Sequence, residues 1–271
     1  MPSDYFDESL AARYERFEFD FPERTLAGRT VVLAGGSGGL GAATAILLAR
    51  EGARLVLGYR SNRERAEALA SAARAAGSPA VELVAGDLNT VETREALLTA
   101  AGPSLEALVA FSGDPARGAD EQTLRASLEA NYLGPVLLAR AAAERLRDAE
   151  TPGSIVLFSS MQGGYPFEGS TAYASAKAAL TQAALVLAKE VGGRPNIRVN
   201  VVAPGATMAG MAQTSLRSGK YDPFVASGVI PRFGRAEDIA RTVRFLIEPD
   251  SYVTGQVLTA DGGMTLRRDQ R

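Results

Sequence analysis

The sequence contains no cysteine and no histidine. Without cysteine, it cannot form disulfides, supply a thiolate nucleophile or build a cysteine metal site. Without histidine, it lacks the most common general base and the most common metal ligand. We therefore expect no metal site, and any acid–base chemistry must come from Tyr, Lys, Asp or Glu.

Long apolar runs and a large excess of one charge are also missing. No apolar run approaches the roughly 20 residues of a membrane span, and the first ten residues contain acids, unlike a secretory signal. A formal net charge of -2 gives no overall attraction to nucleic acid or to an anionic membrane. With 46% hydrophobic residues, the 271-residue chain can bury a large core. These features predict a cytoplasmic protein that binds neither nucleic acid nor membrane.

The N-terminal segment differs from the rest of the chain. Residues 1–27 hold seven acids and three arginines, and Phe17, Phe19 and Phe21 alternate with charged residues. This period of two would place the three rings on one side of an extended strand. We expect an N-terminal extension over 1–27, either frayed or packed as an arm on its own domain or on a neighbouring subunit, followed by one domain over 28–271.

From residue 30 onward, short apolar runs alternate with longer stretches rich in Ala, Leu and Arg. Continuous apolar runs are typical of strands that helices cover on both faces. No repeat and no linker interrupts the alternation, which predicts an α/β fold: one doubly wound parallel sheet of the Rossmann type. We expect strands at 30–34, 54–59, 81–85, 107–112, 154–159, 197–203 and 255–259, and helices at 39–51, 62–76, 90–100, 121–147, 173–191 and 236–247.

A glycine-rich loop lies between the first expected strand and the first expected helix. Glycines let the backbone approach a pyrophosphate, and the helix N-terminus offers free N–H groups and the positive end of a dipole. Glycine-rich turns are common, so the loop alone is weak evidence, but its place in the fold favours a dinucleotide site. The candidate cofactor-binding residues here are Gly35, Ser37, Gly38, Gly39, Leu40 and Gly41.

The end of the second strand bears on cofactor choice. An NAD-selective site places an acid there to bind the ribose 2′-hydroxyl, whereas this chain has Tyr59, Arg60 and Ser61. The arginine and the serine suit a 2′-phosphate, which favours NADPH/NADP as cofactor, although Arg60 could simply face solvent. Asp87 and Leu88, after the third strand, are candidate adenine contacts, and Asp87 could equally cap the next helix.

The reaction chemistry is expected around Ser160, Tyr173 and Lys177. Tyr173 and Lys177 are four residues apart at the start of a helix, so their side chains share a face. A nearby ammonium would lower the pKa of the phenol and make it a usable acid or base near neutral pH. Ser160 ends the fifth strand, where open α/β sheets bind ligands.

Together these motifs resemble the short-chain dehydrogenase/reductase family, in its single-domain form and similar to 3-oxoacyl-carrier-protein reductases. The resemblance implies that Tyr173 donates the proton and that Lys177 holds the nicotinamide ribose. It also implies that Ser160 positions the carbonyl, that Asn131 holds a water in the proton relay, and that the chain assembles as a homo-tetramer or dimer. Without the family, Asn131 reads as a polar residue bonding within its own helix. The matching residues are Gly35, Gly39, Gly41, Asp87, Asn131, Ser160, Tyr173, Lys177, Pro204-Gly205, Thr254-Gly255-Gln256 and Asp261-Gly262-Gly263, and Ser112, Gly113 and Thr207 complete the expected cofactor contacts.

Three departures from the family pattern put the cofactor pocket in doubt. Ala34 replaces the usual threonine before the first glycine. The usual pair of asparagines after the fourth strand is here Ala110 and Phe111. Ala209 replaces a hydroxyl residue after Pro204-Gly205, while Thr207 stands two positions earlier.

Residues 207–230 form a connection too long for an ordinary loop, which predicts a lid. Four of its side chains could face an apolar substrate or could seal the lid onto the body: Met208, Met211, Tyr221 and Phe224. Tyr165, Pro166 and Phe167 are expected to form the opposite wall. We expect a mainly apolar pocket with no fixed charge, suited to a small-molecule carbonyl or alcohol substrate.

The leading hypothesis is an NADPH-dependent oxidoreductase that reduces a ketone to an alcohol. An alternative is an alcohol or sugar dehydrogenase that works in the oxidative direction. A third possibility, from another class, is a nucleotide-binding regulator without turnover, which the presence of Asn131, Ser160, Tyr173 and Lys177 disfavours.

Overall fold

The computed structural model describes residues 25–111 and 113–266. Within them, seven strands form one sheet in the order β3-β2-β1-β4-β5-β6-β7, and every neighbouring pair is parallel. This confirms the predicted doubly wound sheet. The strands are β1 (Thr30–Ala34), β2 (Arg54–Tyr59), β3 (Val81–Ala85), β4 (Leu105–Ala110), β5 (Gly153–Phe158), β6 (Ile197–Pro204) and β7 (Val257–Ala260).

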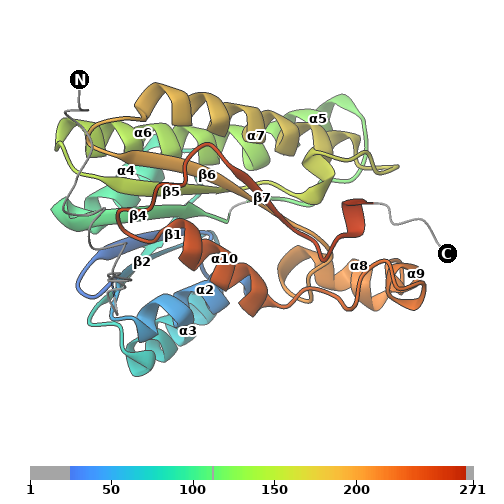
Figure 1. The fold of residues 1–271 in the computed structure, drawn as a ribbon, viewed down its shortest axis with the longest axis horizontal. Coiled ribbons are helices and arrows are strands. Elements are labelled where there is room, and N and C mark those ends of the chain that lie inside the picture. The colour runs from blue at the N-terminus through green and yellow to red at the C-terminus, as the bar shows by residue number, and fades with distance from the viewer. Residues whose placement is uncertain (1–24, 112, 267–271) are drawn as a thin grey trace, which may run out of the picture.

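Helices cover both faces of the sheet (Figure 1). One layer packs its apolar residues with one face of the sheet: α2 (Gly39–Arg50), α3 (Arg63–Ala76) and α10 (Ala236–Leu246). The other face is covered by α4 (Val91–Ala101), α6 (Gly134–Asp148) and α7 (Thr171–Val191), with α5 (Glu121–Leu128) leading into α6. The two layers explain why β1, β4 and β5 are buried along their whole length.

The expected single helix over 121–147 contains a π-helical turn, η2 (Glu129–Leu133), between α5 and α6. Pro135 follows at the start of α6. Because proline has no N–H and crowds the preceding turn, a regular α-helix cannot run through this position undisturbed. A π turn absorbs the irregularity, and Asn131 lies within it.

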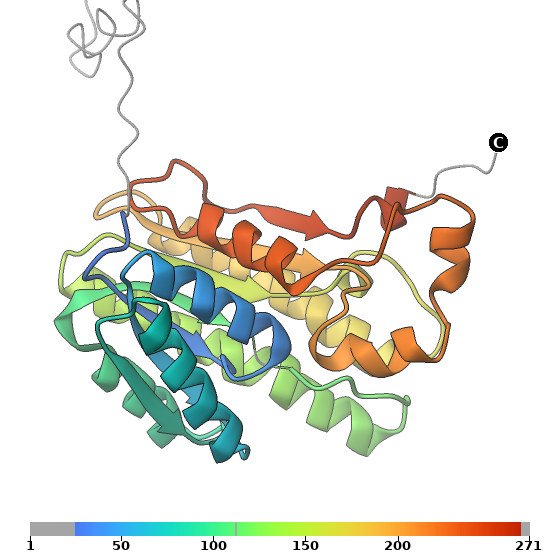
Figure 2. The same cartoon turned by 90° about the horizontal axis from the view of Figure 1, so that it is seen from below.

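The expected lid lies beyond the carboxyl ends of the strands (orange in Figures 1 and 2). It contains η4 (Gly210–Ala212) and two short helices, α8 (Gln213–Arg217) and α9 (Asp222–Ala226). A small apolar cluster joins the lid to the body, with Tyr221 and Ile230 buried against Met161 and Met264. The lid therefore has a packed inner face of its own.

The first described residues, Thr25 and Leu26, contact the body of the domain. Leu26 is fully buried in the core, and Thr25 Oγ1 accepts a hydrogen bond of 2.9 Å from Arg244. The phenylalanines of the expected extension lie outside the described residues. No helix among the described residues combines the length and apolarity that a membrane span requires.

Candidate active site

Two cavities open at the carboxyl ends of the strands. The larger has a volume of about 640 Å³, and the smaller, of about 350 Å³, runs along the glycine-rich loop. Leu40, Phe111 and Met211 line both cavities, so the two are neighbours. This end of the sheet, where the order reverses at β1 and β4, is where doubly wound folds bind ligands.

The smaller cavity gathers most of the expected cofactor residues. Its lining includes Gly35, Ser37, Gly38, Gly39, Leu40, Gly41, Tyr59, Arg60, Ser61, Asp87, Leu88 and Gly113. Tyr173, Lys177, Pro204, Gly205 and Thr207 line the larger cavity instead, while Ser112 lies outside the described residues. The sequence-predicted set is thus divided between two adjoining spaces.

The glycine-rich loop fits a dinucleotide. A Cβ at Gly41 would lie 2.6 Å from Cα of Gly36, so the turn closes too tightly for a side chain. Gly38 caps α2 without a side-chain hydrogen bond, and the first turn of α2 carries no acid. The helix N-terminus therefore presents N–H groups and a positive dipole end to an anionic group such as a pyrophosphate.

A second arginine near this end of the cavity, Arg65, was missed by the sequence reasoning and contacts the glycine-rich loop. Arg65 Nε donates a hydrogen bond of 2.6 Å to the carbonyl oxygen of Ser37 in the glycine-rich loop. Asn62 Oδ1 caps α3 by accepting from the backbone N–H of Arg65, at 2.9 Å. The sequence feature that could have identified Arg65 is its position in the first turn of the helix that follows Arg60.

Asp87 is not the helix cap that the sequence left open. Thr90 caps α4, accepting a hydrogen bond from the N–H of Thr93. The carboxylate of Asp87 accepts from the N–H of Asn89 at 2.9 Å and lines the smaller cavity.

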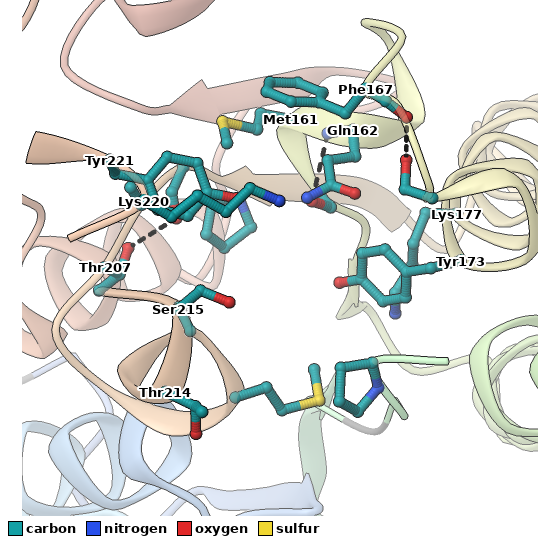
Figure 3. A pocket seen from close by; sticks show the side chains of 18 of the residues that line it. Met161, Gln162, Phe167, Tyr173, Lys177, Thr207, Thr214, Ser215, Lys220 and Tyr221 are labelled. Carbon is teal, nitrogen blue, oxygen red and sulfur yellow. Dashed lines mark hydrogen bonds between the residues drawn. The ribbon is translucent and has the colours of Figure 1, made fainter. Parts of the chain in front are cut away.

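Ser160 and Tyr173 meet at the larger cavity. Ser160 follows β5, its Oγ accepting from the N–H of Gln162 at 3.2 Å, and Tyr173 lies in the first turn of α7. The Tyr173 hydroxyl points into the cavity (Figure 3). Burial raises the pKa of Tyr173 above its ordinary value, and the hydrogen bond with Ser160 offsets only part of that effect.

Lys177 is buried below the ring of Tyr173. Its side chain is 2% exposed, and Nζ donates a hydrogen bond of 2.8 Å to the carbonyl oxygen of Phe158. Nζ lies 5.8 Å from the centroid of the Tyr173 ring. Burial lowers the pKa of Lys177 to about 7. The expectation that the pKa of Tyr173 is lowered is therefore wrong in its net direction, because desolvation by burial is the largest effect on this phenol.

Asn131 is fully buried, and its side chain is already bonded. Oδ1 accepts from the N–H of Asp114 at 3.0 Å, and Nδ2 donates to the carbonyl oxygen of Asp114 at 2.9 Å and to Ser127 Oγ. Ser127, also missed from the sequence, donates in turn to the carbonyl oxygen of Ala172 in α7. The pair therefore fixes the loop after β4 against the helix that carries Tyr173.

Comparison with known proteins decides the family. A family model described as enoyl-(acyl carrier protein) reductase matches residues 34–265. The chain belongs to the short-chain dehydrogenase/reductase family. It is 36% identical over 253 residues to an uncharacterized oxidoreductase of Methylorubrum extorquens, covering 88% of this chain and 98% of the relative. It is 32% identical over 265 residues to NADPH-dependent aldehyde reductase 2 of Arabidopsis thaliana, covering 90% and 97%.

Comparison with solved structures supports the same family. A short-chain type dehydrogenase/reductase from Mycobacterium ulcerans superposes with a TM-score of 0.80 at 25% identity, covering 91% of this chain and 93% of that chain. As a member of the short-chain dehydrogenase/reductase family, the protein is an oxidoreductase acting on CH-OH or C=O groups.

One departure from the family pattern has a structural explanation. Phe111, at a position where the family has an amide, packs against Phe158 with ring centroids 4.3 Å apart and planes inclined by 37°. An apolar contact between the residues at the ends of β4 and β5 therefore replaces the hydrogen bonds that an amide would make at this position. Of the other two, Ala34 is fully buried, and Ala209 packs beside Gly39.

Only part of the predicted substrate wall faces the larger cavity. Met211, Tyr221 and Phe167 line it. The other expected wall residues do not: Met208 is 51% exposed, Phe224 packs in the lid cluster, and Tyr165 and Pro166 are not among the lining residues. Thr207 is buried, and its hydroxyl donates to the carbonyl oxygen of Gly205 at 3.1 Å.

The expectation of a pocket without fixed charge is wrong. Arg117, Glu168 and Lys220 all line the larger cavity. Arg117 comes from the loop after β4 and Lys220 from the lid, and only the fold brings them together. The sequence offered no periodic pattern that could have placed them.

Proposed function

We propose that this protein is an NADPH-dependent oxidoreductase that reduces a ketone or other carbonyl to an alcohol, with Tyr173 as general acid. One observation carries the proposal: the hydroxyl of Tyr173, hydrogen-bonded with Ser160, points into a cavity that adjoins a groove fitted for a dinucleotide. When bound, the cofactor would supply the hydride.

The protein's own residues would handle the carbonyl oxygen. Ser160 would donate a hydrogen bond that orients this oxygen, and Tyr173 would donate the proton that completes the alcohol. The raised pKa of Tyr173 keeps the phenol protonated at neutral pH, which is the form that a proton donor needs.

Lys177 is suited to pass a proton to Tyr173. Its pKa of about 7 lets Nζ gain or lose a proton near neutrality. A Cβ at Gly113 would lie 2.8 Å from Oδ1 of Asn131 and 3.1 Å from Nζ of Lys177, so both groups approach the same point. We assign Asn131 to the relay because it holds the loop at Gly113 and Asp114 beside Lys177.

NADPH is proposed as the cofactor because Arg60 and Ser61 line the smaller cavity at the end of β2, and Arg65 contacts the glycine-rich loop of the same cavity. None of the residues at positions 59–61 is an acid that could bind a free ribose 2′-hydroxyl. The name of the Arabidopsis relative, which specifies NADPH, supports this choice. We also propose that the chain assembles as a homo-oligomer, a dimer or a tetramer.

The test is the Tyr173→Phe variant, with Tyr165→Phe as control because Tyr165 does not line the cavity. A panel of ketones and alcohols is assayed with each cofactor at the nicotinamide absorbance, and NADPH binding is titrated separately. We expect Tyr173→Phe to lose at least about 100-fold in turnover while NADPH affinity stays within about twofold, and the control to match wild type.

Two results would contradict the proposal. Unchanged turnover in Tyr173→Phe would remove Tyr173 from the mechanism. A wild-type protein that binds NADPH but turns over no ketone or alcohol would point to the non-catalytic regulator instead.

A further inference from the structure

The wall of the larger cavity opposite Tyr173 carries two basic side chains. Lys220 and Arg117 both line the cavity, and Figure 3 shows Lys220 directing its amine across the open space towards Gln162. Nζ of Lys220 lies 5.7 Å from the centroid of the Tyr221 ring, and Arg117 donates a hydrogen bond of 3.2 Å to Ser215 Oγ. Each cation is therefore held by a neighbour that itself lines the cavity.

No described acid pairs with these cations. The ion pairs between described residues include neither Lys220 nor Arg117. Glu168 is the acid that lines the cavity, and it takes no part in those pairs either. Both positive charges thus remain available to a bound molecule, with one negative charge elsewhere on the wall.

The positive charge of Arg117 acts on Tyr221, which also lines the cavity. Tyr221 is buried, and burial raises the pKa of its hydroxyl, while the positive charge of Arg117 and a hydrogen bond with Gln162 act in the opposite direction. Neutral hydrogen-bond donors also line the cavity: Gln162, Thr214, Ser215, Ser218 and Tyr221. Charged and neutral donors gathered in this way suit the oxygens of a carboxylate.

The cofactor does not account for these cations. Its phosphates would lie at the N-terminus of α2 and beside Arg60 and Arg65, and neither Lys220 nor Arg117 lines that groove. The same cavity is also lined by the apolar side chains of Met161, Phe167 and Met211. Its lining therefore combines the hydroxyl groups of Tyr173 and Ser160, an apolar surface and two basic side chains.

We propose that the substrate is an oxo acid, whose carboxylate binds between Lys220 and Arg117 while its carbonyl oxygen meets Tyr173 and Ser160. This inference rests on the proposed function, since it assumes that a carbonyl is reduced at Tyr173. Lys220 and Arg117 are then specificity-determining residues, and the carbons between carbonyl and carboxylate contact the apolar side chains of the cavity.

The experiment compares oxo acids, with two to five carbons between carbonyl and carboxylate, against their methyl esters. Each pair is assayed with NADPH on wild type, Lys220→Gln, Arg117→Gln and Glu168→Gln. Arg217→Gln is the matched control, because Arg217 lies in the same lid but does not line the cavity. Affinity of the NADPH-bound enzyme for hexanoate, a carboxylate without a carbonyl, is titrated in parallel.

We expect wild type to prefer at least one acid over its ester by tenfold or more in kcat/KM. Lys220→Gln and Arg117→Gln should each lower this preference at least tenfold, mainly through KM, and should weaken hexanoate binding by a similar factor. Glu168→Gln should strengthen hexanoate binding, because it removes the opposing charge, and Arg217→Gln should leave both measurements unchanged.

Three results separate the outcomes. Esters reduced as well as acids, in a Tyr173-dependent reaction, would overturn the oxo-acid proposal and leave the proposed function intact. Hexanoate affinity that is insensitive to both basic residues would overturn it as well. Failure to reduce acid or ester, combined with hexanoate binding that depends on Lys220, would retain the anion site and reject the proposed reduction.

Discussion

At the scale of single residues, Lys177 shows how burial disfavours the charged form of a side chain. A fully buried amine has lost the hydration that favours its charged form, and its bond to the Phe158 carbonyl restores only part of it. The result is a pKa of about 7, far below the ordinary 10.5. The same burial that lowers the pKa of Lys177 must therefore act on the stability of the fold.

The sign of that effect follows from proton linkage. Between pH 7 and 10.5 the unfolded chain binds more protons at this lysine than the folded chain does, so stability rises with pH across that window. We predict that the unfolding free energy of wild type, measured against Lys177→Met, increases by about 2 kcal/mol between pH 7 and pH 9. Urea unfolding at several pH values checks this.

Lys189→Met provides the control, since Lys189 lies exposed near the end of the same helix. The difference in unfolding free energy between Lys189→Met and wild type should not change with pH. If the difference in unfolding free energy between wild type and Lys177→Met is also independent of pH, Lys177 keeps its ordinary pKa in the folded protein.

The residues that could be predicted from sequence are those that sit on one element or at a strand end. Tyr173 and Lys177 are four residues apart near the start of α7, so spacing placed them on one face. Ser160 follows β5, and its place beside Tyr173 was what the family resemblance implied. Arg117 and Lys220 are about a hundred positions apart on irregular segments, and no period relates them. The pKa of Tyr173 was missed for a related reason, because burial depends on packing from the whole fold.

At the scale of elements, strands were predicted well where an apolar run is followed at once by a glycine or a polar residue, as β1 is by Gly35 and β2 by Arg60. The expected range 30–34 coincides with β1, and 54–59 with β2. The helix over 121–147 was predicted without its π turn, because an apolar repeat does not show how the backbone adjusts around Pro135. The two short lid helices were missed, since five residues give no measurable period.

The junction of β2 and α3 carries the prediction on cofactor choice. Asn62 caps α3 by accepting from the backbone N–H of Arg65, whose side chain donates to the glycine-rich loop, and Arg60 lines the same cavity as that loop. We predict that Arg60→Ala combined with Arg65→Ala weakens NADPH binding at least tenfold, because two cations near the 2′-phosphate are lost. NADH binding should change less than about twofold, since NADH has no phosphate there.

Titration of both cofactors measures the effect, with Arg63→Ala as the matched control. Arg63 lies in the same helical turn but pairs with Glu67 at 2.7 Å. Its loss should therefore not alter the ratio of the affinities for NADPH and NADH. Preference for NADPH that survives the double substitution would show that the 2′-phosphate is recognised elsewhere.

At the scale of the whole molecule, the sheet order brings both cavities to one end and leaves the sides of the domain for other contacts. The layer formed by α5, α6 and α7 lies on the face opposite α2, α3 and α10 (Figure 1). Three leucines on its α5–α6 part are exposed: Leu128 by 40%, Leu133 by 44% and Leu137 by 42%. Large apolar side chains gathered on one face of a monomer are typical of an interface.

We predict that this face joins two copies of the chain. Leu133 and Leu137 are four residues apart and so lie on one side of the helix, and both can be replaced without disturbing the core because they are exposed. The double substitution Leu133→Glu with Leu137→Glu should lower the mass in solution, from tetramer to dimer or from dimer to monomer, as measured by light scattering or analytical ultracentrifugation. Val91→Glu is the control, since Val91 is equally exposed, at 52%, but lies on α4. An unchanged mass in the double variant would exclude this face as the interface, whereas a monomeric wild type would remove the homo-oligomer altogether.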